Sequence, residues 1–134
     1  MITVAISGGF DPVHVGHIRY IHAAAKLGDR LVAILNSDDF LLRKKGYVFM
    51  PLEERKEILE SIKGVDEVVV AIDEDQTVAK TIELLRPDIF AKGGDRVVSV
   101  PEEEEACRKV GCQVVFGVGG GKVQSSSWLV EGRK

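Results

Sequence analysis

Buried-strand patterns alternate with helical patterns along the whole chain. Five short apolar runs stand at residues 2–7, 30–36, 66–72, 88–91 and 112–118. Continuous runs of this kind, rich in Val and Ile, are typical of strands that are buried on both faces. Because consecutive parallel strands need a crossover between them, the alternation predicts a parallel sheet with helices on both sides. We therefore expect a doubly wound α/β domain with a five-stranded parallel sheet.

Proline, acidic residues and glycine mark the helical segments between these runs. We expect helices from about Gly16 to Leu27, from Pro51 to about residue 63, over 76–86 and over 101–110. Pro51 and Pro101 suit a first helical position, and acidic residues follow both of them. Gly28 suits the position just after a helix end. Residues 37–49 are predicted to be irregular, and residues 125–132 to form a short capped helix.

The size and charge of the chain limit its function. With 134 residues, 45% of them hydrophobic, we expect residues 1–134 to form one compact domain. The formal net charge of −3 disfavours long nucleic acids and leaves room for a pocket that binds a small anion. We find no signal peptide or membrane span, so we expect a cytoplasmic protein without a membrane partner. Cys107 and Cys112 lack metal-site spacing and are expected to be reduced core residues.

Three unusual loops follow predicted strands. They read GGFDPVHVGH at 8–17, KGGDR at 92–96 and GGGKVQSSS at 119–127. In an open α/β sheet, ligands bind at the carboxyl ends of the strands, so the three loops should share one rim. Glycines let backbone amides approach a ligand, and consecutive N–H groups at a helix start attract anions. The rim is therefore predicted to hold the ligand.

His14 and His17 give the first loop its distinctive chemistry. Residues three apart at a helix entrance point to one side, so both imidazoles can face one small volume. Zinc needs three or four ligands, and no further ligand stands at a matching spacing, so a metal site is the weaker interpretation. A structural role for the pair is the other alternative. His22 lacks this setting and is expected on the surface or in packing.

Cations and hydroxyls elsewhere are candidate phosphate ligands. Arg55 lies on the apolar stripe of its helix and needs an anion, which is either a phosphate or a structural Asp, unless its side chain reaches solvent. Arg43, Lys44 and Lys45 are either solvated or close over the same anion. The serines at 125–127 cap a helix or contact phosphate. Asp11 is expected to organise its loop by accepting backbone N–H groups.

These motifs, taken together, resemble a known family. The segments that carry the resemblance are GGFDPVHVGH, LGDRLVAILNSDD, PLEERKEILESIKGVDEVV, RPDIFAKGGD and SSSWLV. They resemble, in the same order, the HxGH nucleotidyltransferases of cytidylyltransferase-like type. KGGD is most similar to the adenylyltransferase domain of ADP-heptose synthase, and the next most similar pattern is that of glycerol-3-phosphate cytidylyltransferase.

The resemblance implies a Rossmann-like domain that joins an NTP to a phosphorylated small molecule, with Mg²⁺, and releases pyrophosphate. ATP is favoured over CTP. A heptose 1-phosphate is the first candidate acceptor, and glycerol phosphate, another phospho-alcohol or a flavin precursor are alternatives. A homodimer is also implied. The other classes of function are a nucleotide-sensing module without turnover and a metal-dependent hydrolase.

The same resemblance implies roles for individual residues. His14 and His17 would stabilise charge at the α-phosphorus, with Arg55, Lys45 and Lys44 gripping phosphates. The implied nucleotide-binding residues are Gly8, Gly9, Phe10, Asp11, Lys92, Gly93, Asp95, Lys122, Ser126 and Ser127. Two positions depart from the family pattern. Gly9 stands where many cytidylyltransferases have Thr, and Lys122 stands near the place of an Arg, which binds phosphate differently.

Overall fold

A five-stranded parallel sheet forms the centre of the protein. The computed structural model describes residues 1–93, 100–120 and 130. In this part the strands are β1 (Thr3–Gly8), β2 (Arg30–Leu35), β3 (Glu67–Val70), β4 (Ile89–Gly93) and β5 (Gln113–Val118). They lie side by side in the order β3-β2-β1-β4-β5, and every neighbouring pair is parallel. The predicted Rossmann-like strand count and direction are confirmed.

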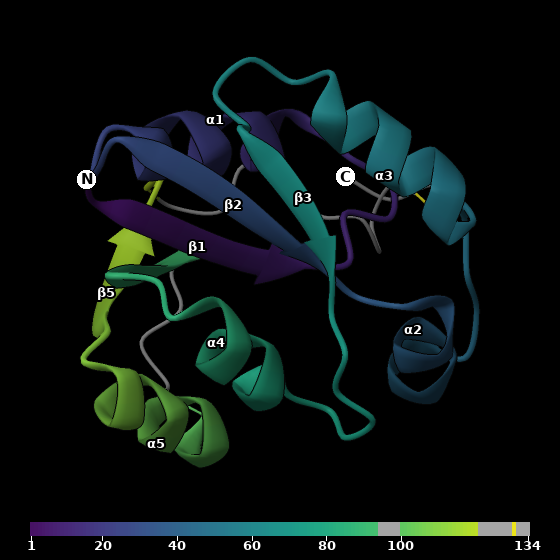
Figure 1. Cartoon of the computed structure of the whole chain (residues 1–134). Helices are drawn as coiled ribbons and strands as arrows, with labels where there is room; N and C mark the ends of the chain where they lie inside the picture. Colours follow the sequence, from purple (N-terminus) through teal and green to yellow (C-terminus); the bar gives the residue numbers. More distant parts are fainter. Residues whose placement is uncertain (94–99, 121–129, 131–134) are drawn as a thin grey trace.

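Helices cover both faces of the sheet. As Figure 1 shows, α1 (Val15–Ala25) and α3 (Leu52–Glu60) lie on one side, and α4 (Ala79–Leu85) and α5 (Pro101–Val110) on the other. Alternate residues of β1 serve the two sides: Val4 and Ile6 join the core cluster under α1 and α3, whereas Ala5 joins the cluster with α4 and α5. The fold is therefore doubly wound, as predicted.

Aspartates form hydrogen bonds at the amino ends of the strands. Asp29, Asp66 and Asp88 stand just before β2, β3 and β4, and each accepts a backbone N–H at the start of a neighbouring segment, at 2.7, 2.8 and 2.8 Å. These bonds satisfy main-chain donors that the parallel ladder leaves open. The amino-end edge is thus closed by short connections, and the longer loops gather at the carboxyl-end edge.

The expectation that residues 37–49 are irregular was wrong, because Asp38–Lys45 form helix α2. The side chain of Ser37 accepts a hydrogen bond from Phe40 N at 3.1 Å, and Gly46 ends the helix with φ = 84°. Acidic residues fill the first turn of α2 and basic residues the last turn, as the helix dipole favours. The sequence therefore contains signals for the start and the end of α2. They were overlooked because the segment is rich in charged and turn-forming residues.

Several helix boundaries also differ from expectation, and α4 begins at Ala79 instead of residue 76. Pro51 precedes α3 as its N-cap instead of occupying the first helical position, and α3 ends at Glu60. Helix α1 ends at Ala25 with Lys26 as its C-cap, so Gly28 does not terminate it. A Cβ at Gly28 would lie 2.7 Å from the carbonyl oxygen of Ile2, so this glycine permits close backbone contact. The helix expected at 125–132 lies outside the described residues, except for Val130.

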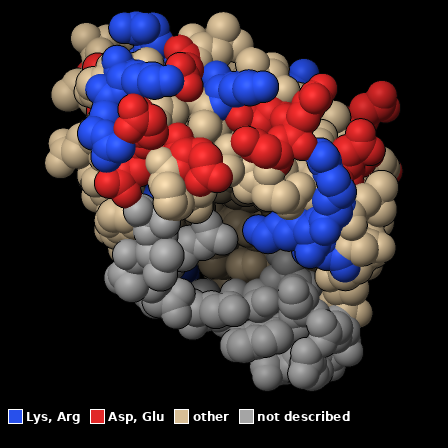
Figure 2. Space-filling view, turned by 90° about the horizontal axis from the view of Figure 1, so that it is seen from below, with Lys and Arg blue, Asp and Glu red and all other residues tan. Residues whose placement is uncertain are grey.

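Acidic and basic side chains are interspersed on the face drawn in Figure 2, where the surface is also hollowed. The described part of that face has no continuous basic stripe in this view, in keeping with the net charge of −3. None of the helices in the described ranges combines the length and apolar character that crossing a membrane requires.

Two left-handed glycines provide a test of the packing between β5 and α1. Gly119 has φ = +91°, and a Cβ there would lie 2.8 Å from Tyr20 Cα, whereas Gly111 has φ = +71° and open space around it. Gly111→Ala should cost about 1 kcal/mol for backbone strain alone. Gly119→Ala should cost about 2–4 kcal/mol, because overlap with backbone is added to the same strain. Urea unfolding of both variants measures the difference, and equal losses would contradict the described contact.

Candidate active site

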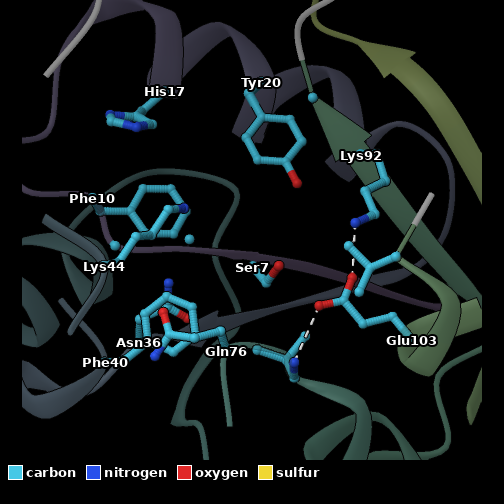
Figure 3. Close-up of a pocket in the computed structure, with 15 residues that line it drawn as sticks. Ser7, Phe10, His17, Tyr20, Asn36, Phe40, Lys44, Gln76, Lys92 and Glu103 are labelled. Carbon is cyan, nitrogen blue, oxygen red and sulfur yellow. Dashed lines mark hydrogen bonds and ion pairs between the residues drawn. The ribbon is translucent and has the colours of Figure 1, made fainter. Parts of the chain in front are cut away.

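A pocket of about 730 Å³ opens where β1, β2 and β4 end. Figure 3 shows His17 and Phe10 on one wall, with Lys92 and Glu103 at one end and Asn36, Phe40 and Gln76 at the other. The described lining also includes Ser7, Gly8, Gly9, Tyr20, Lys44, Val78, Gly93 and Val100. The first and second predicted loops thus share one rim of the sheet, as far as they are described.

A glycine turn brings the backbone of β1 to this pocket. Phe10 has φ = 51°, is 2% exposed, and places its ring centroid 4.9 Å from that of His17. A Cβ at Gly9 would lie 2.8 Å from the Cδ2 atom of Leu41. A threonine at position 9 would therefore require the buried Leu41 to shift, which gives a local packing reason for the departure at Gly9.

His14 and His17 face each other at the start of α1. Their rings stack with centroids 3.9 Å apart and an interplanar angle of 28°. His14 Nδ1 accepts a hydrogen bond from Gly16 N at 3.1 Å, and His17 Nδ1 accepts one from His14 N at 3.2 Å. A neutral imidazole that accepts through Nδ1 carries its hydrogen on Nε2. The prediction that both rings share one side is confirmed, although His17 alone of the two lines the described pocket.

The surroundings of His17 keep its imidazole neutral. Burial lowers the pKa of His17 from 6.5 to about 3, with smaller electrostatic contributions in the same direction from the neighbouring His14 and Lys45 side chains. At neutral pH the side chain is therefore a neutral N–H donor. Its second nitrogen is already engaged in capping the helix, so the ring orientation is fixed in advance.

Asp11 organises the loop that follows the glycine turn. Its two carboxylate oxygens accept hydrogen bonds from Phe49 N at 2.7 Å and Met50 N at 2.6 Å, as the sequence predicts for this residue. Lys45 Nζ donates to the carbonyl oxygen of Asp11 at 3.2 Å and lies 3.9 Å from the Asp11 carboxylate. Asp11 and Lys45 thus join the histidine loop to the segment before α3, and neither lines the described pocket.

Arg55 is an internal cross-link, which corrects the expectation that it grips a phosphate. The side chain is fully buried, and its guanidinium donates to protein oxygens at 2.6–2.9 Å. The acceptors are the carbonyl oxygens of Met50, Gly9 and Asn36 and the carboxylate of Asp38. A phosphate cannot reach this guanidinium without displacing those partners. The alternative of a structural pair with an Asp is the one that the structure supports.

The basic run that ends α2 does not close over a single anion. Arg43 donates to the carbonyl oxygen of Glu74 at 2.7 Å, and Lys45 turns to Asp11. Lys44 lines the pocket, with its ammonium 5.8 Å from the centre of the Phe40 ring. The helical backbone separates these three side chains, because consecutive residues point in different directions around a helix.

A buried ion pair closes the other end of the pocket. Lys92 Nζ donates to Glu103 Oε1 at 2.8 Å, and Glu103 Oε2 accepts a hydrogen bond from Val78 N at 3.1 Å. Sequence reasoning placed Lys92 near the ligand but did not single out Glu103. Glu103 is only 7% exposed, because it lies on the same side of α5 as buried Ala106 and Cys107. That helical spacing was the signal for its burial.

Tyr20 explains the glycine at position 93. The tyrosine hydroxyl donates to the carbonyl oxygen of Ala91, and its ring would lie 2.8 Å from a Cβ at Gly93. Of the other predicted ligands, Asp95, Lys122, Ser126 and Ser127 lie outside the described residues. Sequence reasoning missed Asn36 and Gln76 as pocket residues. Asn36 stands in the segment LGDRLVAILNSDD but was given no role, and Gln76 lies outside the segments that carry the resemblance.

Removing the Arg55 cross-link should destabilise the whole fold. Arg55→Met keeps much of the side-chain volume but leaves three carbonyl oxygens without their donor, so the free energy of unfolding should fall by about 3–5 kcal/mol. Arg108→Met is the control, because Arg108 is 63% exposed and pairs only with surface glutamates. It should cost less than about 1 kcal/mol. Chemical denaturation of both variants measures these losses in the free energy of unfolding. Similar losses in the two variants would refute the internal role of Arg55.

The low pKa of His17 should make the fold sensitive to acid. Between pH 6.5 and about 3, His17 binds a proton in the unfolded chain but not in the folded chain. The free energy of unfolding therefore falls as the pH is lowered through this window. The contribution is at most about 1.4 kcal/mol per pH unit. His17→Asn keeps an acceptor for His14 N and removes the titration, so its stability should depend less on pH. His22→Asn, at an exposed site, should follow the unmodified protein. Identical slopes for all three proteins would exclude the effect.

The sequence of this chain matches those of known proteins. The cytidylyltransferase-like family matches residues 5–118 of this chain. The bifunctional protein HldE of Hahella chejuensis is 41% identical over 119 residues, which cover 87% of this chain and 23% of HldE. The FAD synthase of Aciduliprofundum boonei is 39% identical over 114 residues, which cover 85% of this chain and 75% of that synthase.

Structural comparison leads to the same group of proteins. The lipopolysaccharide core biosynthesis protein of Thermoplasma volcanium superposes with a TM-score of 0.72 at 30% identity, over 87% of this chain and 94% of that protein. The family match over residues 5–118 includes most of β1, all of α1 and the other described helices and strands. The chain therefore belongs to the cytidylyltransferase-like family of nucleotidyltransferases.

Proposed function

We propose that this protein transfers a nucleoside monophosphate from an NTP, with ATP favoured, to a phosphorylated small molecule such as a heptose 1-phosphate, and releases pyrophosphate. The observation that carries the proposal is the stacked pair of His14 and His17, whose Nδ1 atoms are held by backbone N–H groups at the start of α1. Each neutral ring then offers an Nε2–H group in a fixed direction.

The transfer needs placement and charge stabilisation. A phosphate oxygen of the acceptor attacks the α-phosphorus of the NTP, and the bond from that phosphorus to the pyrophosphate oxygen breaks. The acceptor phosphate is largely ionised at neutral pH, because its second pKa is about 6, so no general base is required. Negative charge grows on the α-phosphoryl oxygens and on the leaving pyrophosphate, where fixed N–H donors act most strongly.

The two imidazoles and the helix start provide such donors. A neutral imidazole N–H donates a hydrogen bond without the cost of burying a full charge in the protein. Backbone amides at Gly8–Phe10 and the amino end of α1 add partial positive charge beside the rings. In this proposal the triphosphate lies over the glycine turn, and the nucleoside extends towards Gly93. The predicted contacts of Asp95, Lys122, Ser126 and Ser127 with the nucleotide remain part of the proposal.

Mg²⁺ is proposed to enter as part of the NTP complex. Two buried carboxylates near the pocket, Asp11 and Glu103, are occupied by backbone N–H groups and, for Glu103, by Lys92. They are a poor fit for a metal held by the protein. Phosphate oxygens and water are ordinary ligands of Mg²⁺, and the substrate itself brings them.

The relatives narrow the choice of substrates. FAD contains an adenylyl group, so the relative named as an FAD synthase supports ATP as the nucleotide. HldE supports a sugar phosphate only in part, because this chain spans 23% of that protein. FMN and glycerol 3-phosphate are therefore the alternative acceptors. The homodimer implied by the resemblance and the cytoplasmic location expected from the sequence also remain proposals.

Transfer is tested by measuring pyrophosphate release with each NTP and each phosphorylated acceptor. His17→Asn should keep the helix cap but lose the Nε2–H donor, so the single-turnover rate should fall about 100-fold or more, equivalent to about 3 kcal/mol. His22→Asn should retain the normal rate. Tight NTP binding without pyrophosphate release by the unmodified protein would favour the nucleotide-sensing alternative, and a normal rate in His17→Asn would remove His17 from the mechanism.

A further inference from the structure

Asn36 presents an unsatisfied hydrogen-bond acceptor at the pocket. Among the buried side-chain nitrogen and oxygen atoms of the described residues, Asn36 Oδ1 is the one without a hydrogen-bond partner. The residue is 5% exposed and lines the pocket. A buried carbonyl without a donor is destabilising, because it has lost its hydrogen bonds to water and gained none from protein. The fold tolerates this cost at a position in contact with the pocket.

The backbone of Asn36 is held on both sides. Asn36 N donates to the carbonyl oxygen of Gly8 at 3.0 Å, and the Asn36 carbonyl accepts from Arg55 at 2.8 Å. The Cα position is thereby fixed between the glycine turn and α3. The amide group, however, can turn about the bond between Cβ and Cγ. Such a rotation reorients Oδ1 without moving the main chain, and because Asn36 lines the pocket the residue is suited to meet a ligand.

The two ends of the pocket are lined by different groups. At the end near β4, Lys92 is neutralised by Glu103, and both Glu103 oxygens have partners. At the end near β2 lie Asn36, Phe40 and Gln76 (Figure 3), and the ammonium of Lys44 is 5.8 Å from the centre of the Phe40 ring. Since the proposed reaction places an NTP over the glycine turn and towards Gly93, the end near β2 is left for the second, phosphorylated substrate. A cation there suits the phosphate of that substrate.

We propose that Asn36 determines acceptor specificity, with its side-chain carbonyl accepting a hydrogen bond from a hydroxyl group of a phosphorylated polyol. This inference rests on the proposed transfer function. An ionised phosphate has no hydrogen to donate, so the partner of Oδ1 is another group of the same molecule. Sugar phosphates, glycerol 3-phosphate and the ribityl chain of FMN all carry hydroxyl groups. Asn36 therefore selects the polyol character that these acceptors share.

Binding measurements on the full chain test this assignment. Calorimetry with a non-hydrolysable ATP analogue present compares a heptose 1-phosphate, glycerol 3-phosphate and FMN with n-propyl phosphate, which has no free hydroxyl. At least one of the polyol phosphates should bind the unmodified protein about tenfold more tightly than n-propyl phosphate, as one hydrogen bond allows. The acceptor that shows the preference identifies whether a sugar, glycerol or a flavin is the source of the hydroxyl.

Asn36→Leu should remove the part of that preference that depends on one hydrogen bond. The leucine removes the acceptor atom at similar volume, so the ratio of the affinities for the polyol phosphate and n-propyl phosphate should fall about tenfold, while the affinity for the ATP analogue is unchanged. The variant should melt at the same temperature or higher, since it no longer buries an unsatisfied carbonyl. Asn36→Ala provides a smaller side chain should leucine not fit. Gln113→Leu is the control, because it also replaces an amide side chain with leucine. Gln113 is exposed at the start of β5, and the pocket lies at the other end of the strands.

Three results would overturn the assignment. These are a preference that is unaltered in Asn36→Leu, an equal loss of affinity for the ATP analogue, and the absence of any polyol preference in the unmodified protein. Pyrophosphate release with the same acceptors is measured separately. If the preference depends on Asn36 but no pyrophosphate is released, the transfer function is wrong and the acceptor site stands. If pyrophosphate is released but Asn36→Leu leaves the preference unaltered, the transfer function stands and the role of Asn36 is wrong.

Discussion

A fully buried guanidinium joins the segments that frame the pocket. Arg55 belongs to α3, yet its donors reach the glycine turn after β1, the end of β2, the segment before α3 and the first turn of α2. Its charge is balanced by Asp38 and by three carbonyl dipoles, an arrangement that suits the rigid fork of arginine. The backbone positions of Gly9 and Asn36 depend on this one side chain. The pocket walls are therefore fixed before any ligand arrives.

The hydrophobic pattern predicted the sheet and its two layers of helices, because burial on both faces leaves a clear mark in the five strands. The histidine pair and Asp11 were also predictable, since their roles depend on local spacing and main-chain partners. Arg55 was harder, because the sequence shows that a cation needs a partner but not whether that partner is Asp38 or a phosphate. The partner depends on which distant segments pack together in the fold. Asp38 also lies on α2, a helix that was not predicted because its sequence is dense in charged residues.

Asn36 and Glu103 illustrate the same difficulty for the rest of the site. Each is a common polar residue whose meaning comes from elements distant in sequence: Glu103 meets Lys92 from β4, and Asn36 meets the cavity through the register of β1 with β2. A single sequence does not show which residues distant along the chain come into contact. The spacing of Glu103 with Ala106 and Cys107 did carry a sign of burial, whereas no comparable pattern surrounds Asn36.

Several cations predicted to hold phosphate are already paired with protein oxygens. Arg55 is bound internally, Lys45 holds the Asp11 loop, and Lys92 is paired with Glu103. The proposed transfer then depends largely on neutral donors, which are two imidazoles and backbone amides. Such donors hold the triphosphate of the ground state less strongly than full charges would, and they gain strength as charge moves onto the α-phosphoryl oxygens. Interactions that strengthen along the reaction lower the barrier, whereas those equally strong at the start do not. In the proposed transfer, pairing the cations internally therefore leaves stabilisation of the developing charge largely to the aligned N–H donors.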